Sequence, residues 1–319
     1  MFQTEKMGVF KMNYLPEGML CGTEENKAIL KSASALKACI RTGKILEALA
    51  IVCDSDHNLM VDLGCMKGII PREEGAIGIK NGTVRDIAVI SRVNKPVCFK
   101  VTGIVNGKSG GEVALLSRRL AQEECHQEYL NGLRPGDIIP ARVTHLEAFG
   151  CFVDIGCGIS SLIPIDAASV SRISHPRDRF FVGQSIFAVV KAIDEQGRIS
   201  LTHKELLGTW EQNAALFRPG ETVAGVIRSI EEYGGFVELT PNLAGLAELK
   251  ADVRVGQQAS VYIKSLIPEK MKVKLIIVDA FDAAYQPGEY RYYQTQGHMD
   301  RFCYSPPESG RLVETVFTE

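Results

Sequence analysis

The sequence of 319 residues is 45% hydrophobic and 23% charged, which is typical of globular proteins, and its length predicts two or three domains. It contains no run of about 18 apolar residues, which argues against a transmembrane helix. The formal net charge of −2 argues against a protein that grips duplex DNA by its phosphates. Single-strand binding stays open, because stacking supplies much of its energy.

The nine cysteines are scattered along the chain, and none forms a Cys-x-x-Cys pair. This spacing argues against zinc, and the six histidines show no metal spacing either. The first residues lack a charged-then-apolar signal, so we expect free thiols and a cytoplasmic location. No local motif suggests a Ser/His/Asp or Cys/His set, so the sequence predicts no enzyme, cofactor or metal site.

An N-terminal segment, residues 1–42, is expected to contain one helix. Apolar residues recur at helical spacing from Thr23 to Arg41. Thr23 is a suitable N-cap, and Thr42-Gly43 ends the run.

Short strands are predicted from Lys44 to about Ser117. The candidates are Leu46–Cys53, Asn58–Leu63, Asp86–Arg92, Val97–Val105 and Glu112–Leu116. Two further groups of strands run from Asp137 to Thr202 and from Glu221 to Val278. Five short strands in about 60–80 residues, without a long internal helix, favour a small closed barrel.

The stretches between these groups have helical spacing. One is Arg118–Leu133, and the other opens with the capping box Thr209-x-x-Gln212 and stops at Pro219. Both lack the composition of flexible linkers, so we expect rigid spacers, with Trp210 packed against a neighbouring barrel.

A strand pattern occurs twice in clear form, in residues 148–155 and 232–239. Each copy lies about a dozen residues after a Pro-Gly-acidic start, at residues 135–137 and 219–221. An aromatic residue, a glycine, a small residue and a second aromatic residue precede an alternating strand. Such a pattern can form a stacking platform for unpaired bases.

The middle copy resembles the RNA-binding repeat of the ribosomal S-one protein over about 70 residues. The resemblance rests on the order and spacing of Gly136-Asp137, Arg142-Val143, residues 149–153, Leu162-Ile163-Pro164, residues 182–184, residues 192–194 and residues 197–204. It extends over about 60 residues of the third copy and, in outline only, to residues 43–117.

The resemblance implies a mainly β fold of three consecutive five-stranded oligonucleotide-binding (OB) barrels, joined by short helical connectors. An N-terminal helix precedes the barrels, and an irregular tail follows them. The expected segments are 1–42, 43–118 (degenerate first repeat), 119–134 (connector), 135–204 (second repeat), 205–218 (connector), 219–280 (third repeat) and 281–319 (aromatic-rich tail).

The candidate RNA site of the middle repeat begins with Phe149 and Phe152. Cys151, Val153 and Ile155 alternate into the core, so Phe152 and Asp154 are expected to point outward, with Phe149 in the preceding loop. Outward rings favour stacking on bases, and the alternative is that they cover a connector helix. By resemblance, the matching arginine of the family meets phosphate or base with support from an aspartate. This implies roles for Arg198 and Asp194, and Arg142 on the first strand is a weaker candidate.

The chain departs from the family pattern at several positions. Pro164 stands where the family usually has a histidine. In the third repeat Tyr233 and Phe236 take the aromatic positions and Lys272 replaces the arginine, while Glu248 and Pro268 replace the histidine and the aspartate. His57 and Met60 replace the aromatics of the first repeat, which we therefore expect to be a docking module.

For two further segments, the sequence is compatible with two different roles. Arg172, Arg177 and Arg179, with His175, form either a solvated loop or a phosphate contact beside the platform. Between Tyr285 and Tyr304, the tail combines six aromatic residues with Arg291 and Arg301. It either packs, for example as an added edge strand, or binds RNA.

Together these features predict a cytoplasmic, non-enzymatic protein that binds single-stranded RNA with little sequence preference. By resemblance, its ligand is messenger RNA during translation, and the small ribosomal subunit is a partner through the first repeat. No membrane partner is expected. The alternative is a protein-interaction scaffold or an accessory of RNA metabolism whose RNA binding is weak or lost.

Overall fold

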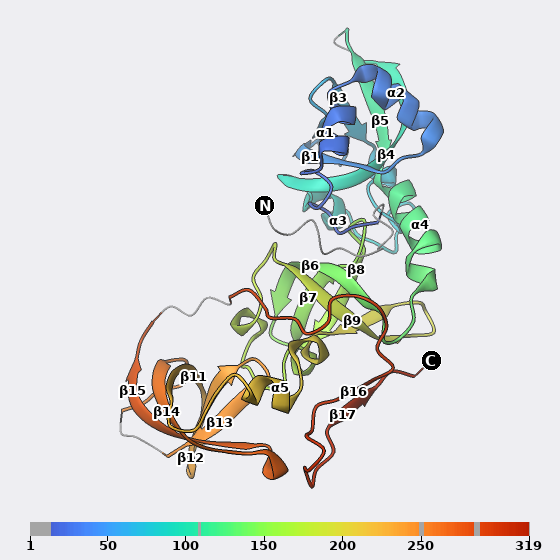
Figure 1. Ribbon diagram of the computed structural model, residues 1–319. Coiled ribbons are helices and arrows are strands. Elements are labelled where there is room, and N and C mark those ends of the chain that lie inside the picture. Colours follow the sequence, from blue (N-terminus) through green and yellow to red (C-terminus); the bar gives the residue numbers. More distant parts are fainter. Residues whose placement is uncertain (1–13, 108–109, 249–251, 284–287, 319) are drawn as a thin grey trace. The chain divides into compact units, whose positions relative to one another are not determined.

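A computed structural model describes residues 14–107, 110–248, 252–283 and 288–318 (Figure 1). The chain divides into two compact units. The first consists of Met1–Leu133 with Asp154–Ser160, and the second of Arg134–Val153 with Ser161–Glu319. No helix in the described part of the chain is both long enough and apolar enough to cross a membrane.

The first unit begins with two short helices, α1 (Glu24–Leu30) and α2 (Ala33–Thr42), in place of the single helix that we predicted. The Thr23 side chain caps α1, as expected. The Ser32 side chain accepts a hydrogen bond from Ala35 N and starts α2, so the helical spacing continues through a break. Gly43, with φ of 62°, ends α2 in the left-handed conformation.

The first barrel has five strands in the closed order β1-β2-β3-β5-β4. The strands are β1 (Leu46–Cys53), β2 (Leu59–Asp62), β3 (Lys67–Ile70), β4 (Lys95–Asn106) and β5 (Glu112–Ser117). Side chains from these strands and Leu36 of α2 form one core around Phe99. The helix pair therefore closes the barrel by burying its apolar face.

The predicted strand Asp86–Arg92 is wrong, because its centre is the helical turn α3 (Ile87–Ile90). A short connection runs from β3 through the 3-10 turn η1 (Arg72–Glu74) to α3. The Asp86 carboxylate accepts hydrogen bonds from Arg72 at 2.6 and 3.1 Å, which fixes the start of the turn. Val89 is the one buried residue of the four, so this segment lacks the alternating buried side chains of a strand.

A buried ion pair joins the N-terminal segment to helix α4 (Arg118–Glu128), which is followed by the turn η2 (Leu130–Gly132). The Glu17 carboxylate accepts hydrogen bonds from Arg118 at 2.6 and 3.0 Å and from Arg92 at 3.3 Å. Burial by itself raises the pKa of Glu17, but the two arginines outweigh it and lower the pKa.

Asp154 is buried in the first unit, so the expectation that it points outward is wrong. Its carboxylate accepts hydrogen bonds from the backbone N–H groups of Glu17, Gly156 and Gly158. Burial, and next the charge of Glu17, raise the pKa of Asp154. Asp154 is covered because the N-terminal segment at Glu17 packs against the end of β7.

The second barrel repeats the arrangement of the first and lies, apart from residues 154–160, in the second unit. Its closed order is β10-β8-β7-β6-β9. The strands are β6 (Ile138–Glu147), β7 (Gly150–Asp154), β8 (Ser160–Pro164), β9 (Ser185–Ile193) and β10 (Ile199–Thr202). The connection from β8 to β9 contains the turns η3 (Ile165–Ala167) and η4 (Pro176–Asp178).

The third barrel closes in the order β11-β12-β13-β15-β14. Its strands are β11 (Thr222–Glu231), β12 (Gly234–Thr240), β13 (Leu243–Ala247), β14 (Gln258–Ile267) and β15 (Lys272–Phe281). The turn η5 (Lys204–Leu207) and helix α5 (Trp210–Ala214) precede it, and the predicted capping box Thr209/Gln212 opens α5. Trp210 packs into the core of this barrel, which confirms that prediction. The predicted fold class of three five-stranded barrels in a mainly β chain is confirmed.

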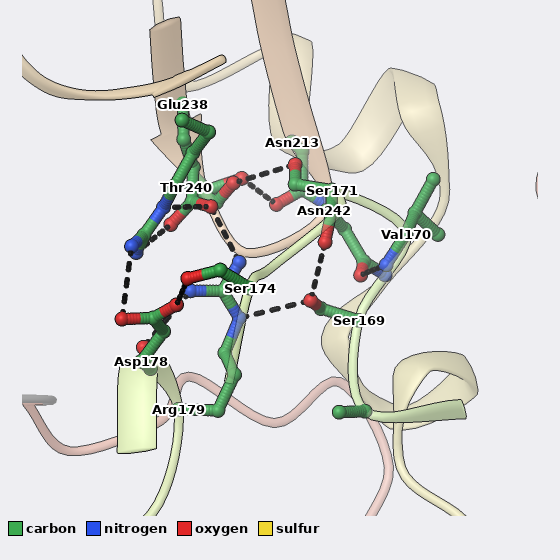
Figure 2. A network of polar contacts seen from close by, with 12 residues as sticks. Ser169, Val170, Ser171, Ser174, Asp178, Arg179, Asn213, Glu238, Thr240 and Asn242 are labelled. Atoms are coloured by element: carbon green, nitrogen blue, oxygen red, sulfur yellow. Dashed lines mark hydrogen bonds and ion pairs between the residues drawn. The ribbon is translucent and has the colours of Figure 1, made fainter. Parts of the chain in front are cut away.

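A buried ionic cluster connects the second and third barrels (Figure 2). Glu238 of β12 accepts hydrogen bonds from Arg179, on the connection between β8 and β9, and from Arg228 of β11. Arg179 is fully buried and also donates to Ser169 Oγ at 2.9 Å, and Arg228 lies 3.5 Å from Asp178. Because all donors and acceptors are paired, the cluster fixes the two connections to each other.

Asn242 supports the same junction through its side-chain amide. Its Oδ1 accepts from Val170 N at 3.0 Å, and its Nδ2 donates to the carbonyl oxygens of Lys204 and Gly208, both at 2.8 Å. The Asn242 carbonyl oxygen accepts the hydroxyl of Tyr304, so the tail meets the same residue. The second unit therefore holds its barrels and tail together by satisfied buried polar groups.

The C-terminal tail packs on the second unit, which agrees with the packing interpretation. Tyr304 and Phe317 are buried. The tail strands β16 (Arg301–Cys303) and β17 (Glu314–Val316) pair with each other and do not extend a barrel sheet.

His203, directly after β10, is fully buried against this tail. Its Nδ1 lies 3.1 Å from the Ala168 carbonyl oxygen, and its Nε2 lies 3.0 Å from the Tyr292 hydroxyl. The Tyr292 hydroxyl accepts from Phe187 N and is thus free to donate to Nε2. Burial lowers the pKa of His203 to about 4, so the ring is neutral.

Replacing Glu238 by Gln should destabilise the second unit by about 3–5 kcal/mol, because the buried Arg179 and the largely buried Arg228 lose their anion. Urea unfolding followed by circular dichroism measures the change. Glu231→Gln is the matched control, since Glu231 is exposed at the end of β11 in the same barrel. Equal stability of the two variants would contradict a structural role for the cluster.

The stability of the second unit should fall as the pH drops from 6.5 towards 4. The unfolded chain binds a proton at His203 near pH 6.5, whereas the folded chain resists protonation until about pH 4. The free energy of unfolding should lose about 2 kcal/mol between pH 7 and pH 5 from this group alone. His203→Gln should remove that loss, and His145→Gln, on an exposed side chain, should keep it. The same pH dependence in both variants would contradict the assignment.

Candidate nucleic-acid interface

Two phenylalanine rings form an exposed platform on the second barrel. Phe149, in the turn between β6 and β7, is 56% exposed, and Phe152 of β7 is half-buried. Their ring centroids lie 5.9 Å apart at an interplanar angle of 88°. Cys151 and Val153, on either side of Phe152, are fully buried, so the alternation of β7 holds Phe152 outward. In this unit no connector helix covers the Phe149 ring.

Gly150 sets the position of these rings. A Cβ atom on this residue would lie 2.6 Å from the Ile163 carbonyl oxygen, so only glycine lets β7 start this close to β8. The aromatic-glycine pattern in the sequence thus has a geometric cause.

His145 of β6 adds a third ring that the sequence analysis did not assign. Its centroid lies 6.4 Å from that of Phe152 at an interplanar angle of 32°, and its side chain is 62% exposed. Its Nε2 lies 2.7 Å from Glu147. In the sequence, the feature that could have identified His145 is its position four residues before Phe149 in the same hairpin. The family histidine position holds Pro164, at the end of β8, which offers neither a ring π-face nor a backbone donor.

Arg198 is a cation that Asp194 holds in place in the turn between β9 and β10. Asp194 accepts hydrogen bonds from the backbone N–H groups of Gln196 and Arg198 and from Arg198 Nε at 2.7 Å. The backbone N–H and then the guanidinium of Arg198 lower the pKa of Asp194. The Arg198 side chain is 77% exposed, so its remaining N–H groups face solvent.

The structure does not bring all candidates of the second barrel together. Strand β8 separates β10, which follows the Asp194–Arg198 turn, from β7, which carries Phe152. Arg142 pairs with Ser185 at the first residue of β9, whereas Asp194 follows the last residue. Arg142 therefore lies most of a strand length from Arg198.

The third barrel presents the same ring geometry. Tyr233 is 69% exposed and Phe236 is half-buried, with centroids 6.4 Å apart at 89°. A Cβ atom on Gly234 would lie 2.6 Å from the Ala247 carbonyl oxygen, which matches the constraint at Gly150. Lys272 is exposed at the start of β15.

The surroundings of Lys272 differ from those of Arg198. Pro268 starts a 3-10 turn, η6 (Pro268–Lys270), where the second barrel has Asp194. No carboxylate in the described part of this barrel pairs with Lys272. The exposed Glu248, which follows β13, adds negative charge at the strand end.

The first barrel has no ring pair among its described residues. His57 lies in the turn before β2 and contacts Asp86 at 3.5 Å, and Met60 is half-buried on β2. Neither residue offers an open aromatic surface for a base.

The basic segment after β8 is divided by the structure. Arg172 and Arg177 are exposed, whereas Arg179 is buried against Glu238. Neither earlier interpretation holds for Arg179, which serves the junction between the barrels.

Comparison with known proteins agrees with this geometry. Residues 133–204 match a family model described as S1 RNA binding domain. The small ribosomal subunit protein bS1 of Staphylococcus aureus (strain COL) is 28% identical over 263 residues, which cover 77% of this chain and 64% of the relative. Its homolog in Bacillus subtilis (strain 168) is 33% identical over 163 residues, covering 50% of this chain and 41% of the relative.

A solved structure, a multidomain protein with nucleic acid binding domains from Streptococcus pneumoniae TIGR4, aligns at 15% identity with a TM-score of 0.24, covering 74% of this chain and 73% of that one. The matched region spans less than two thirds of the length of the S. aureus relative bS1. The second barrel thus matches the S1 RNA binding domain, and the chain is similar to bS1 proteins of the small ribosomal subunit over 77% of its length.

Proposed function

We propose that this protein is a non-enzymatic, cytoplasmic protein that binds single-stranded RNA through its second and third barrels. The observation that carries the proposal is the pair of exposed aromatic platforms, Phe149/Phe152 and Tyr233/Phe236, at equivalent positions of two barrels. Every base has a π-face, so rings of this kind bind unpaired bases with little sequence preference.

The second barrel supplies the stronger site in this proposal. Arg198 is held by Asp194 and needs little further ordering before it meets a phosphate or a base. Arg142, in the middle of β6, is a weaker contributor because it lies most of a strand length from Arg198. In the third barrel, Tyr233, Phe236 and the unsupported Lys272 form the weaker site.

The RNA held in this way is messenger RNA at the small ribosomal subunit. Support comes from the S. aureus and B. subtilis relatives, which are small-subunit ribosomal proteins by name. The first barrel, whose described residues carry no ring pair, would provide the contact with the subunit.

A protein-interaction scaffold is the second candidate. The observation in its favour is negative charge near the third platform, where Glu231 and Glu232 are exposed beside Tyr233. Partner binding without any shift of RNA in a gel would select this candidate.

The double variant Phe149→Ala/Phe152→Ala should weaken binding to unstructured RNA while the barrel stays folded. Each lost stacking contact corresponds to about 1–3 kcal/mol. Fluorescence anisotropy with an oligouridine probe measures the change. Phe181→Ala is the control, because Phe181 is 51% exposed in the same barrel but belongs to the connection after β8. Unchanged affinity of the double variant would remove the platform from the site.

Arg198→Gln should make the salt dependence of RNA binding shallower. One phosphate contact changes the slope of log K against log salt by about 0.7 for single strands. Titrations at several salt concentrations measure this slope. Arg218→Gln, at an exposed arginine of the same unit, should leave it unchanged. A wild-type slope for Arg198→Gln would show that Arg198 meets no phosphate.

A further inference from the structure

The outward face of β14 and β15 in the third barrel is basic and partly apolar. Lys272, Lys274 and Ile276 of β15 are exposed and alternate with buried residues that face the core. Tyr262 and Lys264 of β14 are exposed in the same manner. Tyr262 pairs directly with Ile276, so the two strands present one continuous surface.

This face continues the aromatic platform of the third barrel. Phe236 pairs with Leu246 of β13, and Leu246 pairs with Lys274 of β15. Lys274 in turn pairs with Ser265 of β14. Leu246 is exposed, so a row of outward side chains leads from the ring pair across β13 to the lysines without a break.

The charge of this hairpin is opposite to that of the whole chain. Residues 258–281 contain Lys264, Lys270, Lys272 and Lys274 against Glu269 and Asp279, a difference of 4 − 2 = +2, whereas the chain has −2. Within the described ranges, the side chains of Lys264, Lys272 and Lys274 take part in no ion pair. Three exposed and uncompensated lysines on one sheet face favour an anionic ligand.

We infer that the β14–β15 face is a second RNA contact surface of the third barrel, which binds the phosphate backbone through Lys264 and Lys274 and one base through Tyr262. This inference rests on the proposed function and extends it. Lys264 is the neighbour of Ser265, which pairs with Lys274 across the two strands, so both exposed ammonium groups can meet phosphates of one extended strand. Continuity with the ring pair favours RNA over an acidic protein.

The test uses the full chain and the variant Lys264→Gln/Lys274→Gln. Binding of an oligouridine of about 16 nucleotides is measured at several salt concentrations. The slope of log K against log salt should become shallower by about 1.4, because two phosphate contacts are lost. At 0.1 M salt this change corresponds to a loss of about 25-fold in affinity. Lys31→Gln/Lys80→Gln is the control, because it removes the same charge at exposed lysines of the first unit and should keep the wild-type slope.

A second variant tests the base contact. Tyr262→Leu should weaken binding about fivefold or more, whereas Tyr262→Phe, which keeps the ring, should bind as the wild type does. Unfolding transitions equal to that of the wild type show that each variant is folded.

Each outcome separates this inference from the proposed function. If the wild-type chain binds RNA but the β14–β15 lysine variant keeps its slope, the inference is wrong and the proposed function stands. If both lysine variants change the slope equally, net charge and not this face is responsible, and the inference is again wrong. A wild-type chain that binds no RNA overturns the proposed function together with the inference.

Discussion

The carboxylate of Glu238, shared by the buried Arg179 and the largely buried Arg228, is the interaction on which the second unit depends. Arg179 comes from the connection between β8 and β9 and Arg228 from β11, so one acid ties two barrels together. A buried charge is costly without a partner, and here each charge has one. The cluster therefore adds specificity more than net stability, because it permits one arrangement of the two connections.

Barrel topology was predictable from the sequence because strand alternation and glycine-bounded turns are local signals. The repeated aromatic-glycine pattern also located both ring pairs, since Gly150 and Gly234 meet a backbone constraint that any side chain would violate. Asp86–Arg92 was misassigned because a run of four apolar residues does not distinguish a strand from a helical turn.

The burial of charged residues could not be predicted in the same way. Arg179 is surrounded in the sequence by solvated basic residues, and its partner Glu238 lies 59 residues away. Asp154 ends a strand with an alternating sequence, but a tertiary contact with Glu17, 137 residues earlier, buries its carboxylate. His145 was not assigned from the sequence because a single histidine near an aromatic residue does not by itself indicate a binding site, although the fold places its ring beside Phe152.

The two RNA-binding barrels of the proposal use the same ring geometry but hold their cations differently. Arg198 is fixed by Asp194, whereas Lys272 stands without such a support. A sheet rich in lysine can compensate by spreading charge along two strands, and a fixed arginine concentrates it at one turn. The two barrels would thus divide their affinity differently between stacking and electrostatics.

Trp210 is the only tryptophan of the chain, and it is buried in the core of the third barrel. Indole emission depends on the polarity around the ring, so selective excitation of this residue reports on one barrel alone. The first unit is invisible to this probe. If the two units unfold independently, the fluorescence transition of Trp210 will not coincide with the loss of total β-structure.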